Sequence, residues 1–264
     1  MEKTIMDGTF WLALVGAASW LPQIISWFYS WIAKPRLRFV PEDKTEIGFT
    51  SLGPIFNQSF AISTSRKDAL IERITLAIVH ESGAKHDFYW KFLDERGAEI
   101  TSTTGDRAEF RKNQPAIALK ISVLGLTEKK IGFQDLFYQN KLTSCFRPAQ
   151  EREIYLEKTK VANYQQETIK TKEFLDMLDF IKSGFYWIEG KYDVYLRVYE
   201  TSLRKPHIEH YKFELSKNDI GRMEKNIEIT QESLKDLVLY KGKDLKEWPQ
   251  RFYNWVNPSF YRAK

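Results

Sequence analysis

The stretch YWIEGKYDVYLRVYE, residues 186–200, carries the clearest strand pattern in the chain. Along its second half, apolar side chains alternate with polar or amphipathic ones. One face of an extended chain would carry Tyr192, Val194, Leu196 and Val198, and the other Asp193, Tyr195, Arg197 and Tyr199. Because successive side chains of a strand point to opposite faces, this alternation predicts a β-strand with one buried face.

The same period of two recurs on both sides of this stretch. Further strands are predicted at residues 37–39, 54–64, 74–78 and 88–92, around residues 117–124 and 130–133, and near residues 213 and 227. Between the third and fourth of these lies ESGAK, whose Gly83 indicates a hairpin turn. Short alternating strands separated by turns predict a mainly β protein, built as an antiparallel β-sandwich.

A short motif at the start of the strand, Gly190-Lys191-Tyr192-Asp193-Val194, resembles the tyrosine corner of immunoglobulin-like domains. In that motif a Tyr hydroxyl hydrogen-bonds to an upstream backbone group. The resemblance implies an immunoglobulin-like Greek-key sandwich with Gly190 and Tyr192 at the corner. Antibody domains carry a disulfide Cys two residues after the Tyr, where this chain has Val194, so a variant without the disulfide is implied. The resemblance concerns the fold and points to no particular family.

A helical insertion is predicted between the two groups of strands, at about residues 150–183. Residues 150–182 contain neither Gly nor Pro, and Gly184 follows as a helix stop. An apolar stripe at helical spacing consists of Phe174, Leu175, Leu178 and Ile181. The insertion either packs on the sandwich or docks a partner, and a second short helix is expected at residues 231–239. Residues 35–264 are expected to form one domain, with a division near residue 150 as the alternative.

Residues 9–33, TFWLALVGAASWLPQIISWFYSWIA, contain no charged side chain, although 28% of the whole chain is charged. As a helix this run would be about 36–38 Å long, enough to cross a hydrocarbon core of about 30 Å. No small-x-small cleavage site follows it, which disfavours a cleaved signal peptide; a buried core helix is the other alternative. Residues 1–34 are therefore expected to form a short tail and a single transmembrane helix.

The charges beside this run predict its orientation. Lys34, Arg36 and Arg38 follow the run, whereas Lys3 is the one basic residue before it. Basic residues stay on the cytoplasmic side of a membrane. The N-terminus is therefore expected outside and residues 35–264 in the cytoplasm, at the inner membrane, with membrane lipid as a direct partner.

Small residues also lie within the run. Ala13, Gly16 and Ala17 would share one helix face. Such a face either lets a second helix approach closely or faces lipid without a partner.

The composition limits the function classes. Lys and Arg number 40 against 35 Asp and Glu, which gives a formal charge of +5, but the two signs are interleaved along the chain. Such mixing is typical of a solvated surface, and a nucleic-acid partner is not expected. Cys145 is the single cysteine, so no intrachain disulfide can form, and a buried or inert thiol is expected.

The sequence shows no local catalytic, cofactor or metal motif. It contains no phosphate-binding loop, dinucleotide fingerprint, nucleophile elbow or zinc-protease helix. His80 and His86 flank the predicted hairpin turn, and His207 and His210 are three residues apart, but neither pair has further ligands at metal-binding spacing. Solvent-exposed histidines are expected at both places. No catalytic, cofactor-binding or metal-binding residue is predicted.

The last stretch, KEWPQRFYNWVNPSFYRAK at residues 246–264, mixes aromatic and basic residues. A candidate interaction surface in it consists of Trp248, Phe252, Trp255 and Tyr261. The segment either packs over the sandwich or contacts a membrane or a partner, and single-stranded nucleic acid ranks last.

These features predict a membrane-anchored, non-enzymatic protein-interaction module, or an accessory subunit of a membrane-associated complex, in a setting such as bacterial defence. Its partner would be another protein subunit, or a second copy joined through the transmembrane helix. One alternative is a single-span ligand sensor that signals by oligomerisation and binds its ligand near Trp90, Trp187 and Tyr195. The other is a membrane-tethered metal-dependent hydrolase whose dispersed histidines assemble a site.

Overall fold

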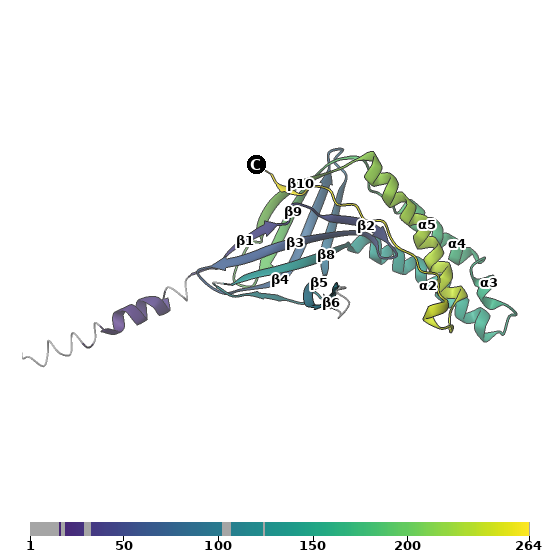
Figure 1. Ribbon diagram of the computed structural model, residues 1–264, viewed down its shortest axis with the longest axis horizontal. Helices are drawn as coiled ribbons and strands as arrows, with labels where there is room; N and C mark the ends of the chain where they lie inside the picture. The colour runs from purple at the N-terminus through teal and green to yellow at the C-terminus, as the bar shows by residue number, and fades with distance from the viewer. Residues whose placement is uncertain (1–15, 17–18, 29–32, 102–106, 124, 264) are drawn as a thin grey trace, which may run out of the picture.

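The computed structural model describes residue 16 and residues 19–28, 33–101, 107–123 and 125–263. Within these residues, 11 strands form one sheet that curves into a barrel-like shape, and a layer of helices extends from one end of it (Figure 1). Hydrogen-bonded neighbours follow the order β1-β3-β8-β5-β4-β9-β10-β11, with β2 beside β3, β6 beside β5 and β7 beside β4.

The strands pair antiparallel throughout this order. They are β1 (Arg36–Pro41), β2 (Glu46–Thr50), β3 (Gly53–Ser65), β4 (Ala69–His80), β5 (Lys85–Thr101), β6 (Arg107–Pro115), β7 (Leu119–Ile121), β8 (Leu126–Asp135), β9 (Gly190–Glu200), β10 (His207–Leu215) and β11 (Tyr261–Arg262). The helices are α2 (Leu136–Lys158), α3 (Tyr164–Thr168), α4 (Lys172–Ser183), α5 (Lys217–Leu239) and the short 3₁₀ helix η1 (Leu245–Glu247).

The strand predicted from the alternation in residues 186–200 is confirmed as β9. Its side chains from Tyr192 to Val198 are buried at every second position, and those between them are half-buried on the outer face. β9 pairs with β4 on one side, where Leu76 lies opposite Leu196, and with β10 on the other. Because both of its edges are paired, β9 is a central strand of the sheet.

The predicted immunoglobulin-like sandwich is wrong, because the strands form one continuous curved sheet rather than two facing sheets. The core consists of inward-facing side chains from strands at both ends of this sheet. Alternation of period two shows that one face of a strand is buried. The alternation looks the same whether a second sheet or the opposite side of the same curved sheet covers that face.

Large aromatic rings fill the inside of the curved sheet. Phe56 and Phe133 face each other from β3 and β8 with ring centroids 6.3 Å apart, and both are fully buried. Trp187, just before β9, packs against Phe88 and Phe213 at centroid distances of 6.0 and 6.5 Å. Burying such rings supplies a large share of the hydrophobic stabilisation of the sheet.

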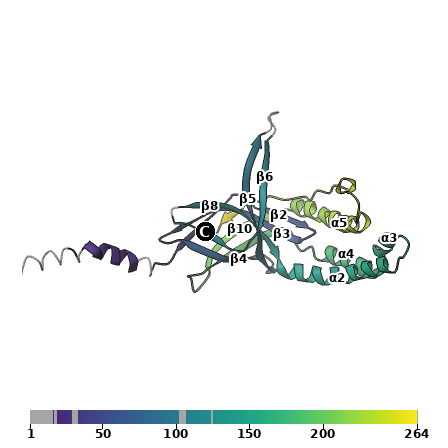
Figure 2. The same cartoon turned by 90° about the horizontal axis from the view of Figure 1, so that it is seen from below.

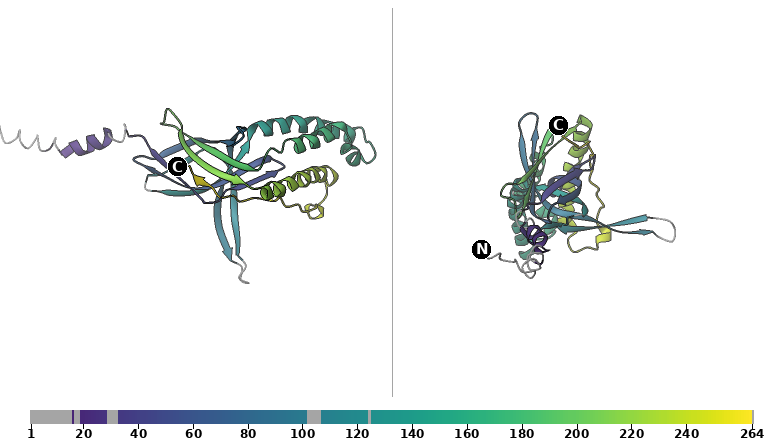
Figure 3. Two further views of the ribbon diagram at one scale, coloured as in Figure 1. Left: turned by 90° about the horizontal axis from the view of Figure 1, so that it is seen from above. Right: turned by 90° about the vertical axis from the view of Figure 1, so that its left-hand side faces the viewer.

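A closing segment, residues 256–263, joins the two ends of the sheet. It first pairs with β2, and the N–H of Phe260 donates to the carbonyl of Asp43 at 2.8 Å. At its other end it forms β11 beside β10, and the N–H of Ala263 donates to the carbonyl of His210 at 3.0 Å. Figure 3 shows the C-terminus beside the green strands β9 and β10. Backbone hydrogen bonds of this segment therefore leave the sheet nearly closed.

The helical layer begins directly at the end of β8. The carboxylate of Asp135 accepts a hydrogen bond from the backbone N–H of Tyr138 and so caps α2. This helix starts at Leu136, earlier than the predicted insertion, and continues through Pro148. Together α2, α4 and α5 enclose a second apolar core, apart from the sheet interior. Its buried members are Phe49, Tyr138, Ala149, Phe174, Met177, Leu178, Ile181, Leu234 and Val238.

The strand predicted near residue 227 is wrong, because this region lies inside α5. Ile227 and Ile229 alternate with polar residues, but over a longer window the sequence has helical spacing. A capping box of Ser216 and Asp219 starts the helix, with each side chain hydrogen-bonded to the backbone of the other residue. The box is the sequence signal that the short alternation obscured.

Residues 19–28 are helical and lie at the opposite end of the sheet from the helical layer (Figure 1). Among the described residues, no helix is long and apolar enough to cross a membrane. The predicted single-pass placement in the inner membrane, with a cytoplasmic body, is therefore wrong. A span needs about 20 apolar residues in one helix, and the absence of charge does not establish such a helix. Of the predicted packing face, Ala13 and Ala17 lie outside the described residues, and Gly16 is helical and exposed.

The hairpin predicted at Gly83 is confirmed, since this glycine, with φ of +89°, lies in the turn from β4 to β5. Further along, β5 leaves the body of the sheet. Its first part pairs with β4 and β8, whereas its last described residues pair with β6. The β5–β6 hairpin stands away from the rest of the sheet as an arm (Figure 2).

Candidate functional site

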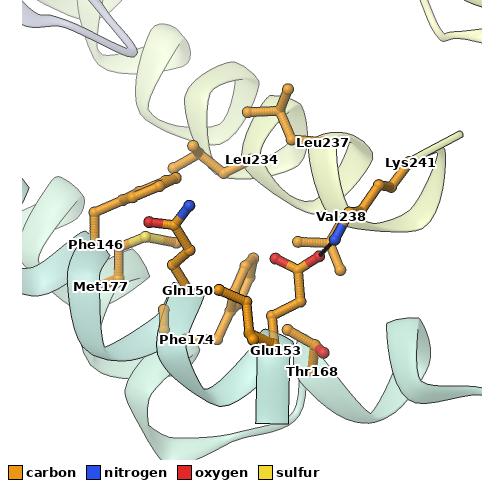
Figure 4. Close-up of a pocket in the computed structure, with 12 residues that line it drawn as sticks. Phe146, Gln150, Glu153, Thr168, Phe174, Met177, Leu234, Leu237, Val238 and Lys241 are labelled. Atoms are coloured by element: carbon orange, nitrogen blue, oxygen red, sulfur yellow. Dashed lines mark hydrogen bonds and ion pairs between the residues drawn. The ribbon is translucent and has the colours of Figure 1, made fainter. Parts of the chain in front are cut away.

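A groove of about 370 Å³ opens in the helical layer between α2, α4 and α5. Its apolar lining consists of Phe146, Ala149, Ile154, Phe174, Met177, Leu234, Leu237 and Val238. Its polar lining consists of Gln150, Glu153, Thr168 and Lys241. Figure 4 shows Phe146 and Met177 toward one end of the groove and Glu153 with Lys241 toward the other. An apolar concavity with a few polar groups of this kind is the usual form of a binding site.

Helical periodicity explains how α2 and α4 line the groove. On α2, Phe146, Gln150 and Glu153 are four and three residues apart and so share one face. On α4, Phe174 and Met177 are three apart, and both are almost fully buried. Leu175, which was part of the predicted stripe, is 47% exposed and points away from this core. The other predicted stripe residues are buried.

An ion-pair cluster marks one end of the groove. Nζ of Lys241 donates to Oε1 of Glu153 at 2.9 Å and to Oε2 of Glu157 at 3.0 Å. These hydrogen bonds raise the pKa of Lys241 well above its ordinary value, so the ammonium stays charged. Two carboxylates against one ammonium leave this end of the groove with a net negative charge.

Exposed apolar side chains extend the groove onto the surface. Phe146 and Ile154 on α2 are each 39% exposed, and Leu237 on α5 is 48% exposed. All three line the groove, from opposite sides of its opening. The apolar surface at this place is therefore larger than the cavity alone, as is typical of interaction sites.

A buried carboxylate connects the sheet to this helical layer. Asp135 accepts hydrogen bonds from the hydroxyl of Tyr186 at 2.9 Å and from the N–H of Tyr138 at 3.0 Å, and Nδ1 of His86 lies 3.7 Å from its Oδ2. Burial raises the pKa of Asp135, but contacts with His86, Tyr138 and Tyr186 outweigh this and hold it below its ordinary value. The His86 ring stacks on the Tyr186 ring at 3.6 Å. The ionised carboxylate thus holds together the hairpin, the helix start and the approach to β9.

The histidines do not converge on one site. His80 is buried, contrary to the prediction, and contacts the hydroxyl of Ser82 at 2.8 Å and the carbonyl of Glu189 at 3.1 Å. His86 lies apart from it, against Asp135. The described residues hold no group of three or more His, Cys, Asp or Glu side chains placed to bind a metal ion.

The second histidine pair is also divided. His207 contacts Glu209 at 2.8 Å, and His210 contacts Asp193 at 2.7 Å and stacks on Tyr195. Cys145 is half-buried and packs at the edge of the second core.

The three aromatic residues of the predicted ligand pocket are not brought together. Trp90 and Trp187 are buried in the sheet interior, whereas Tyr195 lies on the outer face of β9. Tyr195 lies between the inward-facing Val194 and Leu196 on β9, so its own side chain points to the outer face, away from the core.

The motif of the tyrosine corner forms a local hydrogen bond within the single sheet. The hydroxyl of Tyr192 donates to the carbonyl of Ile188 at 2.7 Å. Gly190 has φ of +137°, and a Cβ here would lie 2.5 Å from Nε2 of His80. Only glycine fits at this position without strain.

The aromatic residues of the C-terminal stretch are dispersed rather than gathered into one surface. Trp255 packs its ring over Gly48 of β2, and Trp248 is half-buried near Tyr240. Phe252 is 79% exposed, and Tyr261 is exposed on β11. This part of the chain leads into the closing segment of the sheet.

Of the predicted membrane-flanking residues, Lys34 is exposed before β1, and Arg36 and Arg38 lie on the outer face of β1. Phe174 belongs to the predicted stripe, and Gln150 and Glu153 lie within the predicted insertion, but the sequence did not predict that these residues line a groove. Phe146, Gln150 and Glu153 have helical spacing, but this spacing crosses Pro148, and the helical insertion is predicted only after it.

No protein-family model matches this chain. No curated protein matches it in sequence either. Among solved structures, a family 123 glycoside hydrolase from Clostridium perfringens, studied for glycolipid glycan hydrolysis, is similar with 10% identity and a TM-score of 0.31. The similarity covers 69% of this chain and 28% of that chain. A likeness of this size supports no conclusion about fold or activity.

Proposed function

We propose that this chain is a non-enzymatic protein-interaction module that holds an amphipathic helix of a partner protein in the groove between α2, α4 and α5. The observation that carries the proposal is the continuity of the groove with exposed apolar side chains. All three side chains concerned line the groove and are also exposed to solvent: Phe146, Ile154 and Leu237. Covering them on binding would bury apolar surface and stabilise a complex.

The size and extent of the apolar surface favour a helix over a small ligand. A ligand that filled the 370 Å³ cavity would leave the outer parts of Phe146 and Leu237 in water. A helix lays several apolar side chains, spaced three or four residues apart, along such a groove and covers its margins. The partner helix is thus expected to carry an apolar stripe.

The charges at the groove end specify the partner further. Lys241 balances one of the two carboxylates of Glu153 and Glu157, so a negative charge is left over. A Lys or Arg of the partner helix at this end would complement it. The expected partner segment therefore combines an apolar stripe with a basic residue near one end.

Site-specific photo-crosslinking tests the proposal. A photoreactive amino acid replaces Leu237 in the groove, and in a control it replaces Leu175, which is equally exposed but outside the groove. Crosslinked segments are identified by mass spectrometry, and a fluorescent peptide of each is titrated against the protein. We expect a partner segment with an apolar helical stripe to crosslink at 237 and not at 175.

The titration then uses Leu237→Glu and the control Leu175→Glu. We expect Leu237→Glu to weaken peptide binding at least about tenfold, because it places a charge against the apolar stripe, and Leu175→Glu to leave binding unchanged. Equal crosslinking at both positions, crosslinks to copies of this chain alone, or equal peptide affinity of the two variants would overturn the proposal.

A further inference from the structure

A second concavity lies where the two ends of the sheet approach each other, between β1 and β10. It has a volume of about 590 Å³ and receives side chains from β1, β3, β10 and β11. The hydroxyl of Tyr211 on β10 reaches the carbonyl of Phe39 on β1 at 3.4 Å, beside this cleft. The closing segment bridges the sheet further along, so the seam stays open at the cleft.

Arg36 and Arg38 place two positive charges at the cleft. They are two residues apart on β1 and so share its outer face. Their cross-strand neighbours on β3 are Ser65 and Ser63, which carry hydroxyl groups and no charge. Within the described part of the chain, neither guanidinium forms an ion pair.

A third guanidinium and a buried carboxylate complete the cleft. Glu209 is 4% exposed, and its two oxygens contact Arg262 and Nε2 of His207. Burial, aided by the charge of Arg262, lowers the pKa of His207, which favours the neutral imidazole. One carboxylate against three guanidinium groups leaves the cleft with an excess of two positive charges.

Two other arginines on the outside of the sheet, Arg197 and Arg73, have partners. Arg197 lies 3.9 Å from a carboxylate oxygen of Asp87, and Arg73 lies over the ring of Tyr199 at 4.0 Å. The cleft therefore differs from the mixed-charge surface elsewhere. Arg36 and Arg38 carry like charges on one strand face and so repel each other, and a bound anion would relieve this repulsion.

We infer that this cleft binds the phosphoryl group of a small phosphorylated ligand. Guanidinium groups match the oxygens of a phosphoryl group with paired N–H donors, and the hydroxyls of Ser63 and Ser65 can donate as well. A dianion would balance the two excess positive charges. The volume exceeds what one phosphate needs, so the rest of the ligand also has room in the cleft.

Isothermal titration of the full chain tests this site with two probes, sodium pyrophosphate and glycerol 3-phosphate. The first represents free polyphosphate-bearing compounds and the second a lipid headgroup, so their relative affinities separate the two sources. The variant Arg36→Gln/Arg38→Gln removes the two guanidinium groups of the cleft. The control Arg73→Gln/Arg147→Gln removes the same charge from exposed positions that do not line the cleft, on β4 and α2.

We expect one probe molecule to bind per chain, at least about tenfold more weakly in the Arg36→Gln/Arg38→Gln variant, with the control unchanged and affinity falling as salt rises. Circular dichroism checks that both variants are folded. Absence of saturable binding for both probes, or an equal loss in both variants, would overturn the site. The groove variant Leu237→Glu should bind the probes normally, so failure here and failure of the proposed function can be told apart.

Discussion

The curved sheet and the helical layer bury their apolar side chains differently. Inside the sheet, Phe56 and Phe133 are fully enclosed by strands whose backbone hydrogen bonds continue almost all the way round. In the helical layer, Phe174 and Met177 are nearly as buried, but they lie beneath a groove open to solvent. The sheet thus provides a closed scaffold, and the layer retains apolar surface that a partner can cover.

The largest expected effect compares one Phe from each region. Phe133→Ala should lower the free energy of unfolding by about 3–5 kcal/mol, because it leaves a cavity in a closed core. Phe174→Ala should cost less, about 2–3 kcal/mol, since it enlarges a groove that solvent already reaches. Urea denaturation followed by Trp fluorescence measures both.

Equal costs for the two variants would contradict the difference between a closed and an open core. If Phe133→Ala does not fold, Phe133→Leu can replace it, with an expected cost of about 1–1.5 kcal/mol. Phe174→Leu then serves as its partner in the comparison.

The next effect concerns the junction of the two regions. Asp135→Asn removes the charge that the hydroxyl of Tyr186 and the imidazole of His86 contact. We expect a loss of about 1–3 kcal/mol in the free energy of unfolding, as for other buried charged hydrogen-bond acceptors. Asp219→Asn, in the exposed capping box of α5, is the matched control and should cost about 1 kcal/mol or less.

The same junction predicts a dependence on pH. The folded-state pKa of Asp135 lies below its unfolded value, so its carboxylate stabilises the fold above a pH of about 4. This contribution is lost as the pH falls through the folded-state pKa. The stability difference between the wild type and Asp135→Asn should therefore shrink below about pH 4. A difference that is constant with pH would show that the charge of Asp135 is not responsible.

The smallest expected effect lies at the edge of the groove. Lys241→Gln breaks the contacts with Glu153 and Glu157, but the cluster is partly exposed, so the cost should be less than about 1 kcal/mol. The same change leaves two unbalanced carboxylates at the groove end. It should therefore tighten binding of a basic partner peptide by a few fold, measured by fluorescence polarisation. Weaker binding would contradict the expected charge of the partner.

Most strands were predictable because each of them carries its own signal, whereas β2, β6 and β11 were not predicted. Tyr192 to Val198 alternate inward and outward, and Gly83 marks a turn, so local sequence is sufficient for β9 and for the β4–β5 hairpin. Closure of the sheet was not predictable in this way. It depends on contacts such as Phe260 with Asp43, which are distant in the sequence and leave no local pattern.

The groove was less accessible to prediction than the strands. Glu153 on α2 forms an ion pair with Lys241, which follows α5. No local sequence pattern around either residue predicts this contact. The stripe from Phe174 to Ile181 correctly indicated a buried helix face, but a stripe does not tell which parts of that face another helix leaves uncovered. The predicted membrane span and sandwich were both inferred from patterns that several three-dimensional arrangements satisfy.

The position of the closing segment has a consequence for biosynthesis. Residues 256–263 come after β1 to β10 along the chain, yet their partners include Asp43, which lies between β1 and β2. Those early strands must wait for translation of the intervening chain, and sheet contacts separated by so many residues form slowly. The seam therefore cannot assemble before residues 256–263 have been translated, and until then its edges are open to chaperones or to neighbouring chains.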